Sequence, residues 1–305
     1  LLLSAVNLPL TLYRIFGIDA RYGFNNMTLA LFITDLGKKT LLALLLGLPL
    51  LIGVLWIMDK MGEYWWLYVW LVWSGFNLLV LALYPTLIAP LFNKFTPLTD
   101  PALQARIEKL LEKCGFRVQG LFVVDGSKRS SHSNAYFTGF GKSKRIVFFD
   151  TLLQRLDADE IVAVLAHELG HFKRRHIVKR IVWLFLASFI GLALLGWLIN
   201  EPWFYSGLGV DTPSTAMALL LFLLVTPVFT FLLQPLASLY SRKHEFEADQ
   251  YAANQASAAK LVAALVKLYK DNASTLTPDP LHSAFYDSHP PASLRIAHLK
   301  NLVNG

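Results

Sequence analysis

Residues 160–199 read EIVAVLAHELGHFKRRHIVKRIVWLFLASFIGLALLGWLI. In the first half, apolar residues recur at helical spacing around the run His167-Glu168-Leu169-Gly170-His171. In the second half, Ile181–Ile199 is apolar and reaches the length of about 20 residues that crosses a bilayer core. The stretch therefore predicts a helix with reactive side chains, joined through a short basic segment to a membrane-spanning helix.

Composition extends the membrane prediction to the rest of the chain. Of the 305 residues, 55% are hydrophobic and 16% are charged, whereas soluble domains carry about 25% charged residues. Because the first residue is Leu rather than Met, we expect that N-terminal sequence including membrane helix is missing. Membrane spans are expected at Thr40–Met58, Trp65–Tyr84, Ile181–Ile199 and Thr215–Ser238, with Leu1–Leu12 as the end of another.

The net charge of +7 lies mainly in loops on one side of these spans. Fourteen Lys or Arg residues lie between Pro85 and His176 and seven follow Ser238, whereas Asn200–Ser214 contains none. Basic loops stay in the cytoplasm. Both long polar segments are therefore expected on the cytoplasmic face of a bacterial inner membrane or an endoplasmic reticulum membrane. This placement of basic residues in cytoplasmic loops accounts for the net charge. We therefore expect a lipid bilayer as a partner and expect no nucleic acid.

The polar segments predict one small domain that a membrane hairpin interrupts. We divide the chain into residues 1–88 (membrane helices and a cytoplasmic loop), 89–176 (first part of the domain), 177–238 (membrane hairpin) and 239–305 (second part). Helices are expected at Pro101–Cys114, from Asp157, at Ser241–Asn254, at Ala258–Lys270 and from Pro291, and a loop at Leu10–Gly37. Asp157 and Glu160 have the spacing of a capping box at the start of the second of these helices. Strands are expected at Leu121–Val124, Asn134–Phe140 and Arg145–Phe149, with a turn at Gly141–Lys144, as a hairpin or three-stranded sheet.

The run His167-Glu168-Leu169-Gly170-His171 has the HExxH spacing of a metal site. On a helix, residues four apart share a face, so both imidazoles can bind one ion with Glu168 beside them. The single cysteine, Cys114, excludes a cysteine-rich zinc site and leaves histidine and carboxylate ligands. These ligands suit one Zn²⁺ per chain with an open position for water, whose proton Glu168 can accept. Gly170 indicates either close helix packing or neutral drift.

A third ligand must come from elsewhere in the chain. The metzincin pattern requires His six residues after His171, where Ile177 stands, and that class is rejected. We assign His176, one residue earlier, to the basic segment at the membrane boundary.

Downstream carboxylates remain, and Glu245 and Asp249 lie four residues apart on one predicted helix. This spacing permits Glu245 to bind the metal while Asp249 accepts a hydrogen bond from a ligating His. Glu247 points elsewhere, and a salt-bridged surface helix is the alternative interpretation. Two membrane crossings separate His171 from Glu245, so both reach the same face of the membrane.

Together these segments resemble the membrane-embedded zinc metalloproteases of peptidase family M48, of the CAAX prenyl protease type. The resemblance runs across nearly the whole chain and implies seven membrane helices around a chamber that the zinc site faces, the first helix being absent here. It rests on Arg21–Thr28 (RYGFNNMT), Ser131–Phe137 (SHSNAYF), the HELGH helix, Ser241–Asp249 (SRKHEFEAD), Ser288–Pro291 (SHPP) and Arg295, in that order.

The resemblance also implies a set of site residues. His167, His171 and Glu245 would bind zinc, and Glu168 would be the general base. His289 would stabilise the oxyanion with support from Arg295, and Asn134, with Tyr136 on the same strand, would hold the substrate backbone. His132, His282 and His298 match no motif and are interpreted as structural.

The expected fold is mainly α: a polytopic bundle or barrel of membrane helices with a cytoplasmic, gluzincin-like zinc protease domain containing a small β-sheet. The expected function is zinc-dependent hydrolysis of peptide or protein substrates, with CAAX-type processing of prenylated C-terminal peptides implied by the resemblance. An HtpX-type quality-control protease is the rival enzyme, although Arg21–Thr28 favours the CAAX type. A transporter or zinc carrier is the other rival, but its site would usually lie near the bilayer midplane. No oligomeric state is indicated.

Overall fold

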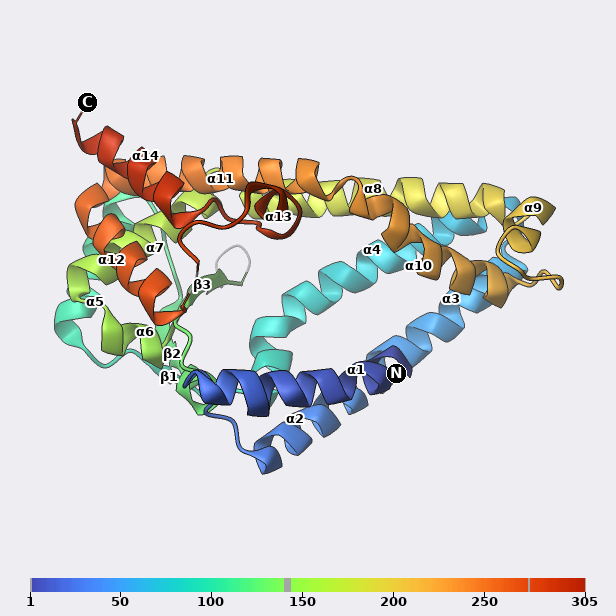
Figure 1. Cartoon of the computed structure of the whole chain (residues 1–305), viewed down its shortest axis with the longest axis horizontal. Coiled ribbons are helices and arrows are strands. Elements are labelled where there is room, and N and C mark those ends of the chain that lie inside the picture. The colour runs from blue at the N-terminus through green and yellow to red at the C-terminus, as the bar shows by residue number, and fades with distance from the viewer. Residues whose placement is uncertain (1, 140–143, 274, 305) are drawn as a thin grey trace. The chain divides into compact units, whose positions relative to one another are not determined.

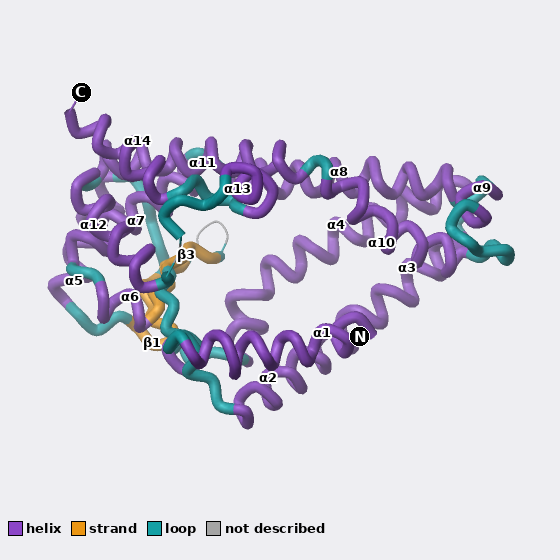
Figure 2. The backbone as a smooth tube through the Cα atoms, in the orientation of Figure 1, coloured by secondary structure: helices purple, strands orange, loops and turns teal. Residues whose placement is uncertain are grey.

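The computed structural model describes residues 2–139, 144–273 and 275–304. The chain divides into two compact units, each built from segments that are distant in sequence. One comprises Leu1–Lys38, Tyr84–Arg174 and Ser238–Gly305, and the other comprises Lys39–Leu83 and Arg175–Ala237. Figure 2 shows that helices dominate and that the strands form one small group. The mainly α-helical fold with a small sheet is thus confirmed.

The unit formed by residues 39–83 and 175–237 consists of apolar helices. Its elements are η2 (Ala43–Gly47), α3 (Leu48–Lys60), η3 (Gly62–Tyr64), α4 (Trp65–Leu83), α8 (His176–Leu198), α9 (Pro202–Ser206) and α10 (Thr215–Phe231). Helices α4 and α8 pack together at Gly196, where an added Cβ would lie 2.7 Å from the Trp66 ring. The indole Nε1 of Trp70 also donates to the Phe185 carbonyl of α8 at 2.9 Å. Most other side chains of these helices are exposed and apolar, as lipid contact requires.

Among the described residues, three helices are long and apolar enough to cross a membrane: Leu29–Lys60, Gly62–Leu91 and His176–Leu198. Thr215–Phe231 and Gln234–Gln255 make a fourth crossing if this pair, bent by 64°, is one broken span. Three of the expected spans are therefore present as helices of sufficient length, although the first begins earlier than Thr40. The span expected at Thr215–Ser238 is interrupted after Phe231. The loop expected at Leu10–Gly37 is wrong, because η1 (Tyr13–Asp19) and α2 (Leu29–Leu42) occupy most of it.

Charged residues explain why α2 was missed. Asp35, Lys38 and Lys39 lower the hydropathy of the segment, yet the structure gives Asp35 a partner. The carboxylate of Asp35 is 4% exposed and accepts from Nε and Nη2 of Arg129 at 2.7 and 3.0 Å. Lys38 Nζ donates to the Leu91 carbonyl at 2.7 Å. A buried carboxylate is tolerated when it is paired in this way.

The other unit contains a four-stranded sheet in the order β1-β2-β4-β3. β1 (Phe95–Pro97) runs antiparallel to β2 (Gly120–Val124), β2 is parallel to β4 (Arg145–Phe149), and β3 (Ala135–Thr138) is antiparallel to β4. The three expected strands are present, but β3 is shorter than expected. Phe140 and residues 141–143 of the expected turn lie outside the described residues. β1 was missed because it has three residues and ends at Pro97, which cannot donate to a ladder.

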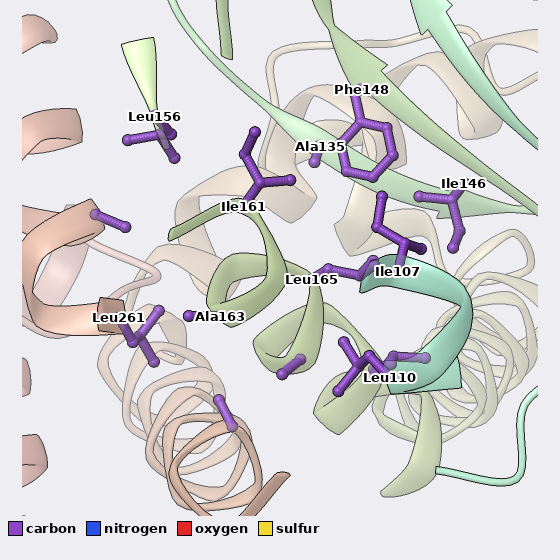
Figure 3. Close-up of a cluster of buried hydrophobic side chains, with 14 of the residues drawn as sticks. Ile107, Leu110, Ala135, Ile146, Phe148, Leu156, Ile161, Ala163, Leu165 and Leu261 are labelled. Atoms are coloured by element: carbon purple, nitrogen blue, oxygen red, sulfur yellow. The ribbon is translucent and has the colours of Figure 1, made fainter. Parts of the chain in front are cut away.

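One face of this sheet packs against helices and forms the larger hydrophobic core (Figure 3). Ile146 and Phe148 of β4 are fully buried there, against Ile107 of α5 (Pro101–Lys113) and Leu165 of α7 (Ala158–Lys173). Each such side chain stabilises the fold by about 1.5–3 kcal/mol. This core fixes α7 beneath the sheet.

Further helices complete this unit (Figure 1). α12 (Ala258–Asp271) agrees closely with expectation, and α14 (Ala292–Asn304) begins one residue after Pro291. α11 (Gln234–Gln255) ends as expected but begins seven residues before Ser241, inside the span expected at Thr215–Ser238. The remaining elements are α1 (Leu2–Leu12), η4 (Tyr84–Ile88), η5 (Ala89–Leu91), η6 (Gly126–Lys128), α6 (Asp150–Arg155) and α13 (Pro280–Tyr286).

Candidate metal centre

The helix α7 begins with the capping box that the sequence predicts. Asp157 accepts from the Glu160 amide, and Glu160 accepts from the Asp157 amide, each at 2.8 Å. Lys267 of α12 also donates to Glu160 at 2.7 Å. These contacts satisfy amides at the N-terminus of α7 and tie it to α12.

Helix α7 approaches α11 very closely at Gly170. A Cβ added there would lie 2.9 Å from Cα of Ala248 and 3.1 Å from Cβ of Tyr251. Gly170 therefore permits the close packing that was one of its two interpretations. Because Gly170 follows His167 by three residues and Ala248 follows Glu245 by three, this crossing brings the predicted ligands together.

The three predicted metal ligands form a tight triangle. Nε2 of His167 and Nε2 of His171 are 3.1 Å apart. Glu245 reaches both, with Oε1 3.2 Å from His171 Nε2 and Oε2 3.6 Å from His167 Nε2. Within the described residues, these side chains can each offer one ligand atom to a single ion. Oε2 of Glu245 is buried and makes no hydrogen bond to any described group, as expected of an oxygen that binds a metal.

Behind this triangle, Asp249 and Arg295 orient the ligands. Nδ1 of His167 lies 2.8 Å from Oδ1 of Asp249. Since a carboxylate can only accept, Nδ1 carries a proton, and in the neutral ring Nε2 then has the lone pair that a metal needs. Arg295 is buried and binds Asp249 through Nη2 and Nε at 2.6 and 2.9 Å, and its Nη1 lies 3.4 Å from Glu245 Oε2.

Burial and neighbouring charged groups shift the pKa values of His167 and Glu168 on α7. Burial alone would lower the pKa of His167, but hydrogen bonds to Asp249 and Glu245 raise it to about 9 in the metal-free centre. Burial raises the pKa of the Glu168 carboxyl above its ordinary value, although both neighbouring imidazoles oppose this. A carboxylate with a raised pKa is a stronger base, which suits proton transfer.

His289 lies at the open side of the ligand triangle. Its side chain is 63% exposed, and its Nε2 is 3.6 Å from Glu245 Oε1. Nδ1 is 3.0 Å from the hydroxyl of Ser288. Arg295, which the resemblance pairs with His289, instead contacts Asp249 and Glu245.

Tyr269 is a neighbour that sequence reasoning missed. Its hydroxyl donates to the Pro290 carbonyl at 3.4 Å, one residue beyond His289. Burial raises the pKa of Tyr269 above its ordinary value, and the charge of nearby Arg295 opposes this. An aromatic residue in an amphipathic helix such as α12 usually indicates core packing. The sequence therefore gave little reason to place Tyr269 beside the metal centre.

The predicted substrate-binding residues lie on β3, an edge strand of the sheet. Asn134 is exposed and its Oδ1 accepts from the Ala135 amide at 2.8 Å, so it begins the strand. Ala135 packs into the core, whereas Tyr136 faces a cavity of about 200 Å³ on the opposite sheet face, shared with Tyr84 and Arg145. Burial raises the pKa of Tyr136 to about 12, and its hydroxyl therefore stays protonated.

The other histidines lie outside the triangle. His132 stacks on Phe24, and His282 lies against Tyr286. His176 is buried at the start of α8, directly after the basic residues of the segment to which the sequence assigned it. Glu247 faces away from the triangle and lines a separate cavity with His298.

Comparisons with known proteins agree with this arrangement. The family model "Peptidase family M48" matches residues 97–303, and "CAAX prenyl protease N-terminal, five membrane helices" matches residues 1–94. The chain belongs to peptidase family M48. It is therefore an integral membrane metalloprotease, a class for which a His, His, Glu triangle is a suitable metal centre.

Individual M48 relatives cover nearly the whole chain. The CAAX prenyl protease 1 homolog of Arabidopsis thaliana is 42% identical over 95% of this chain and 69% of its own length. CAAX prenyl protease 1 of Saccharomyces cerevisiae is 40% identical over 97% of this chain and 69% of its own. The crystal structure of S. mikatae Ste24p aligns with a TM-score of 0.91 and 39% identity, covering 98% of this chain and 73% of that one.

Proposed function

We propose that this M48 protein is a zinc metalloendopeptidase that processes CAAX-type prenylated C-terminal peptides at the cytoplasmic membrane face. The observation that carries this proposal is the triangle of His167, His171 and Glu245, in which the buried Oε2 of Glu245 makes no hydrogen bond to any described group. The substrate class is supported by relatives named CAAX prenyl proteases. The membrane face is supported by the basic loops that contain the site.

The ligand spacing supports zinc as the metal. Tetrahedral zinc with bonds of about 2.0–2.1 Å to nitrogen or oxygen requires ligand atoms about 3.3 Å apart. The two imidazole nitrogens are 3.1 Å apart and Oε1 of Glu245 is 3.2 Å from His171 Nε2, both close to that value. When bound, zinc supplies a Lewis acid that polarises the scissile carbonyl.

The chain's own groups would carry the proton transfers. Glu168 accepts the proton of the attacking water and passes it to the leaving amine, as a general base and then a general acid. Asp249 keeps His167 in the tautomer that leaves Nε2 available. Arg295 holds Asp249 and Glu245 in position. His289, from the exposed side, donates to the oxyanion of the tetrahedral intermediate.

The edge strand β3 offers a site for an extended substrate. Its backbone pairs only with β4 among the described residues, so the N–H and C=O groups on its other edge can bind a peptide. Asn134 at the start of this strand would hold the substrate backbone, and Tyr136 would fix the strand through its cavity.

The decisive experiment compares matched peptides. The full chain, purified in detergent and loaded with zinc, is given a C-terminal CAAX peptide with or without a farnesyl group on its cysteine. We expect cleavage of the prenylated peptide to be at least about tenfold faster, because a buried isoprenoid adds binding energy. Glu168→Gln, with the same zinc content, is the inactive control. Equal rates would instead favour a general quality-control protease, and zinc-independent cleavage would exclude the proposed chemistry.

A further inference from the structure

The face of α11 next to the one that carries Glu245 and Asp249 lines a second cavity. Leu239, Arg242, Lys243, Phe246 and Gln250 follow the spacing i, i+3, i+4, i+7 and i+11, and they therefore share one side of the helix. The cavity has a volume of about 590 Å³, within the usual range of roughly 300–1,000 Å³ for ligand sites. Its remaining lining residues are Arg174, Glu247, Pro290, Leu294 and His298.

Cations outnumber anions among the charged residues that line this cavity. Arg174 and Lys243 are exposed, and Glu247 is the only carboxylate among the ten lining residues. Arg242 donates to the backbone carbonyls of Ser283 and Asp287 of the α13 region. These acceptors are neutral, so they fix the guanidinium without cancelling its charge. A fixed guanidinium flanked by further cations suits a phosphate group.

One buried polar atom in the wall lacks a partner. Nε2 of His298 is buried and makes no hydrogen bond to any described residue. Its ring packs edge-on against Phe246, with centroids 5.0 Å apart. This atom is covered by the protein itself, so the ring shapes the wall of the cavity and offers no hydrogen bond to its interior.

The cavity also has an apolar side at the membrane boundary. Leu239 and Leu294 are 60% and 55% exposed. Arg174 precedes the candidate span α8 by two residues, and α11 forms the second half of the broken candidate span. Basic pockets at this level of a membrane protein meet anionic lipid headgroups.

We propose that this cavity binds the headgroup phosphate of an anionic phosphoglyceride from the surrounding bilayer. Arg174, Arg242 and Lys243 contact the phosphate. The glycerol and acyl portions lie along Leu239 and Leu294. A soluble phosphate would use the cations but leave both leucines exposed to water, which is why the lipid is favoured. This inference does not depend on the proposed protease substrate.

The test uses the full chain in a neutral detergent and three probes of related chemistry. Dioctanoyl phosphatidylserine is the anionic lipid, dioctanoyl phosphatidylcholine has the same chains without net charge, and glycerol 3-phosphate has no chains. Binding to unmodified protein is compared with binding to Arg174→Gln/Lys243→Gln. The matched control, Lys109→Gln/Lys270→Gln, removes the same charge from exposed lysines outside the cavity.

We expect saturable binding of phosphatidylserine, at least tenfold tighter than that of either other probe. The cavity variant should lose at least tenfold in affinity, whereas the control variant should stay within twofold of unmodified protein. Zinc content and melting temperature of both variants should be unchanged, because the replaced side chains are exposed. Equal losses in the two variants, or equal binding of phosphatidylcholine, would show no specific headgroup site. Tight binding of glycerol 3-phosphate alone would replace the lipid with a soluble phosphate and overturn the proposal.

Discussion

The two faces of α11 differ in how their charges are satisfied. On the face toward α7, Glu245 and Asp249 are 5% and 0% exposed, and Asp249 is bound by Arg295 and His167. On the adjacent face, which lines the second cavity, Lys243 is exposed and Leu239 is 60% exposed. A buried charged network holds its geometry before any ligand arrives, as catalysis requires. The open face instead suits an adaptable partner such as a lipid. Substitutions should therefore have their largest effects on the buried side.

The largest effect is expected for Glu168→Gln. The ligand triangle is untouched, but the proton acceptor is removed, so turnover should fall by roughly 10²–10⁴-fold. Zinc content measured on the same purified sample should be unchanged. Loss of the metal, or retention of activity, would contradict the role of Glu168.

His289→Ala tests the exposed side of the centre. If its imidazole donates to the oxyanion, turnover per bound zinc should fall by about 10²–10³-fold, the effect of losing one such donor. Peptide affinity and melting temperature should change little, since the side chain is 63% exposed. Normal turnover per zinc would remove His289 from the catalytic set.

Glu245→Ala and Glu247→Ala compare the two faces of α11 directly. Glu245 lies 3.2 Å from His171 Nε2 and its loss removes a ligand, so zinc affinity should fall by more than roughly 100-fold. Glu247 lines the second cavity beside α11, and its replacement should leave the zinc affinity within about twofold of that of the unmodified protein. Zinc titrations of both variants decide the matter. The reverse ranking would mean that the wrong carboxylate has been chosen.

What the sequence could predict depended on whether the signal was local. The HELGH motif, the capping box of Asp157 and Glu160, and the apolar spans are local patterns, and the structure contains all of them. The membership in family M48 was likewise readable from several short motifs. The α2 helix was missed because its buried Asp35 is satisfied by Arg129, a partner 94 residues away.

Around the metal centre, too, contacts between residues that are far apart in the sequence could not be predicted. Spacing within α11 suggested that Asp249 could orient a histidine, but not that Arg295 binds Asp249 and Glu245 from another helix. Tyr269 had no motif at all, because its contact with the Pro290 carbonyl exists only in the folded chain. Long-range polar pairs of this kind have no period or spacing in the sequence.

Gly170→Ala probes the crossing that joins the two helices. A methyl group would lie 2.9 Å from Cα of Ala248, so α7 and α11 must separate slightly. Overpacking of this kind costs about 1–3 kcal/mol, against a gain of roughly 1 kcal/mol in helix propensity. We expect lower thermal stability and weaker zinc binding. Gly37→Ala in α2 is the matched control, because nothing described lies within 4 Å of its added Cβ. Equal effects of the two substitutions would show that the crossing does not set the ligand geometry.

The smallest expected effect is a proton released on zinc binding. In the metal-free centre, the pKa of His167 is raised from 6.5 to about 9 by its hydrogen bonds to Asp249 and Glu245, which outweigh burial. A raised pKa means that the protonated imidazole stabilises the metal-free fold fully below pH 6.5, and that this stabilisation is lost as the pH rises through about 9.

Zinc needs the neutral ring, so binding at pH 7.5 should release about one proton. The apparent zinc affinity should increase by up to about tenfold per pH unit between pH 6.5 and 9. Calorimetry in buffers of different ionisation enthalpy measures the proton count. Asp249→Asn should lower that count, because the amide no longer stabilises the imidazolium. Zinc binding without proton release at pH 7.5 would mean that the buried face does not hold His167 in its charged form.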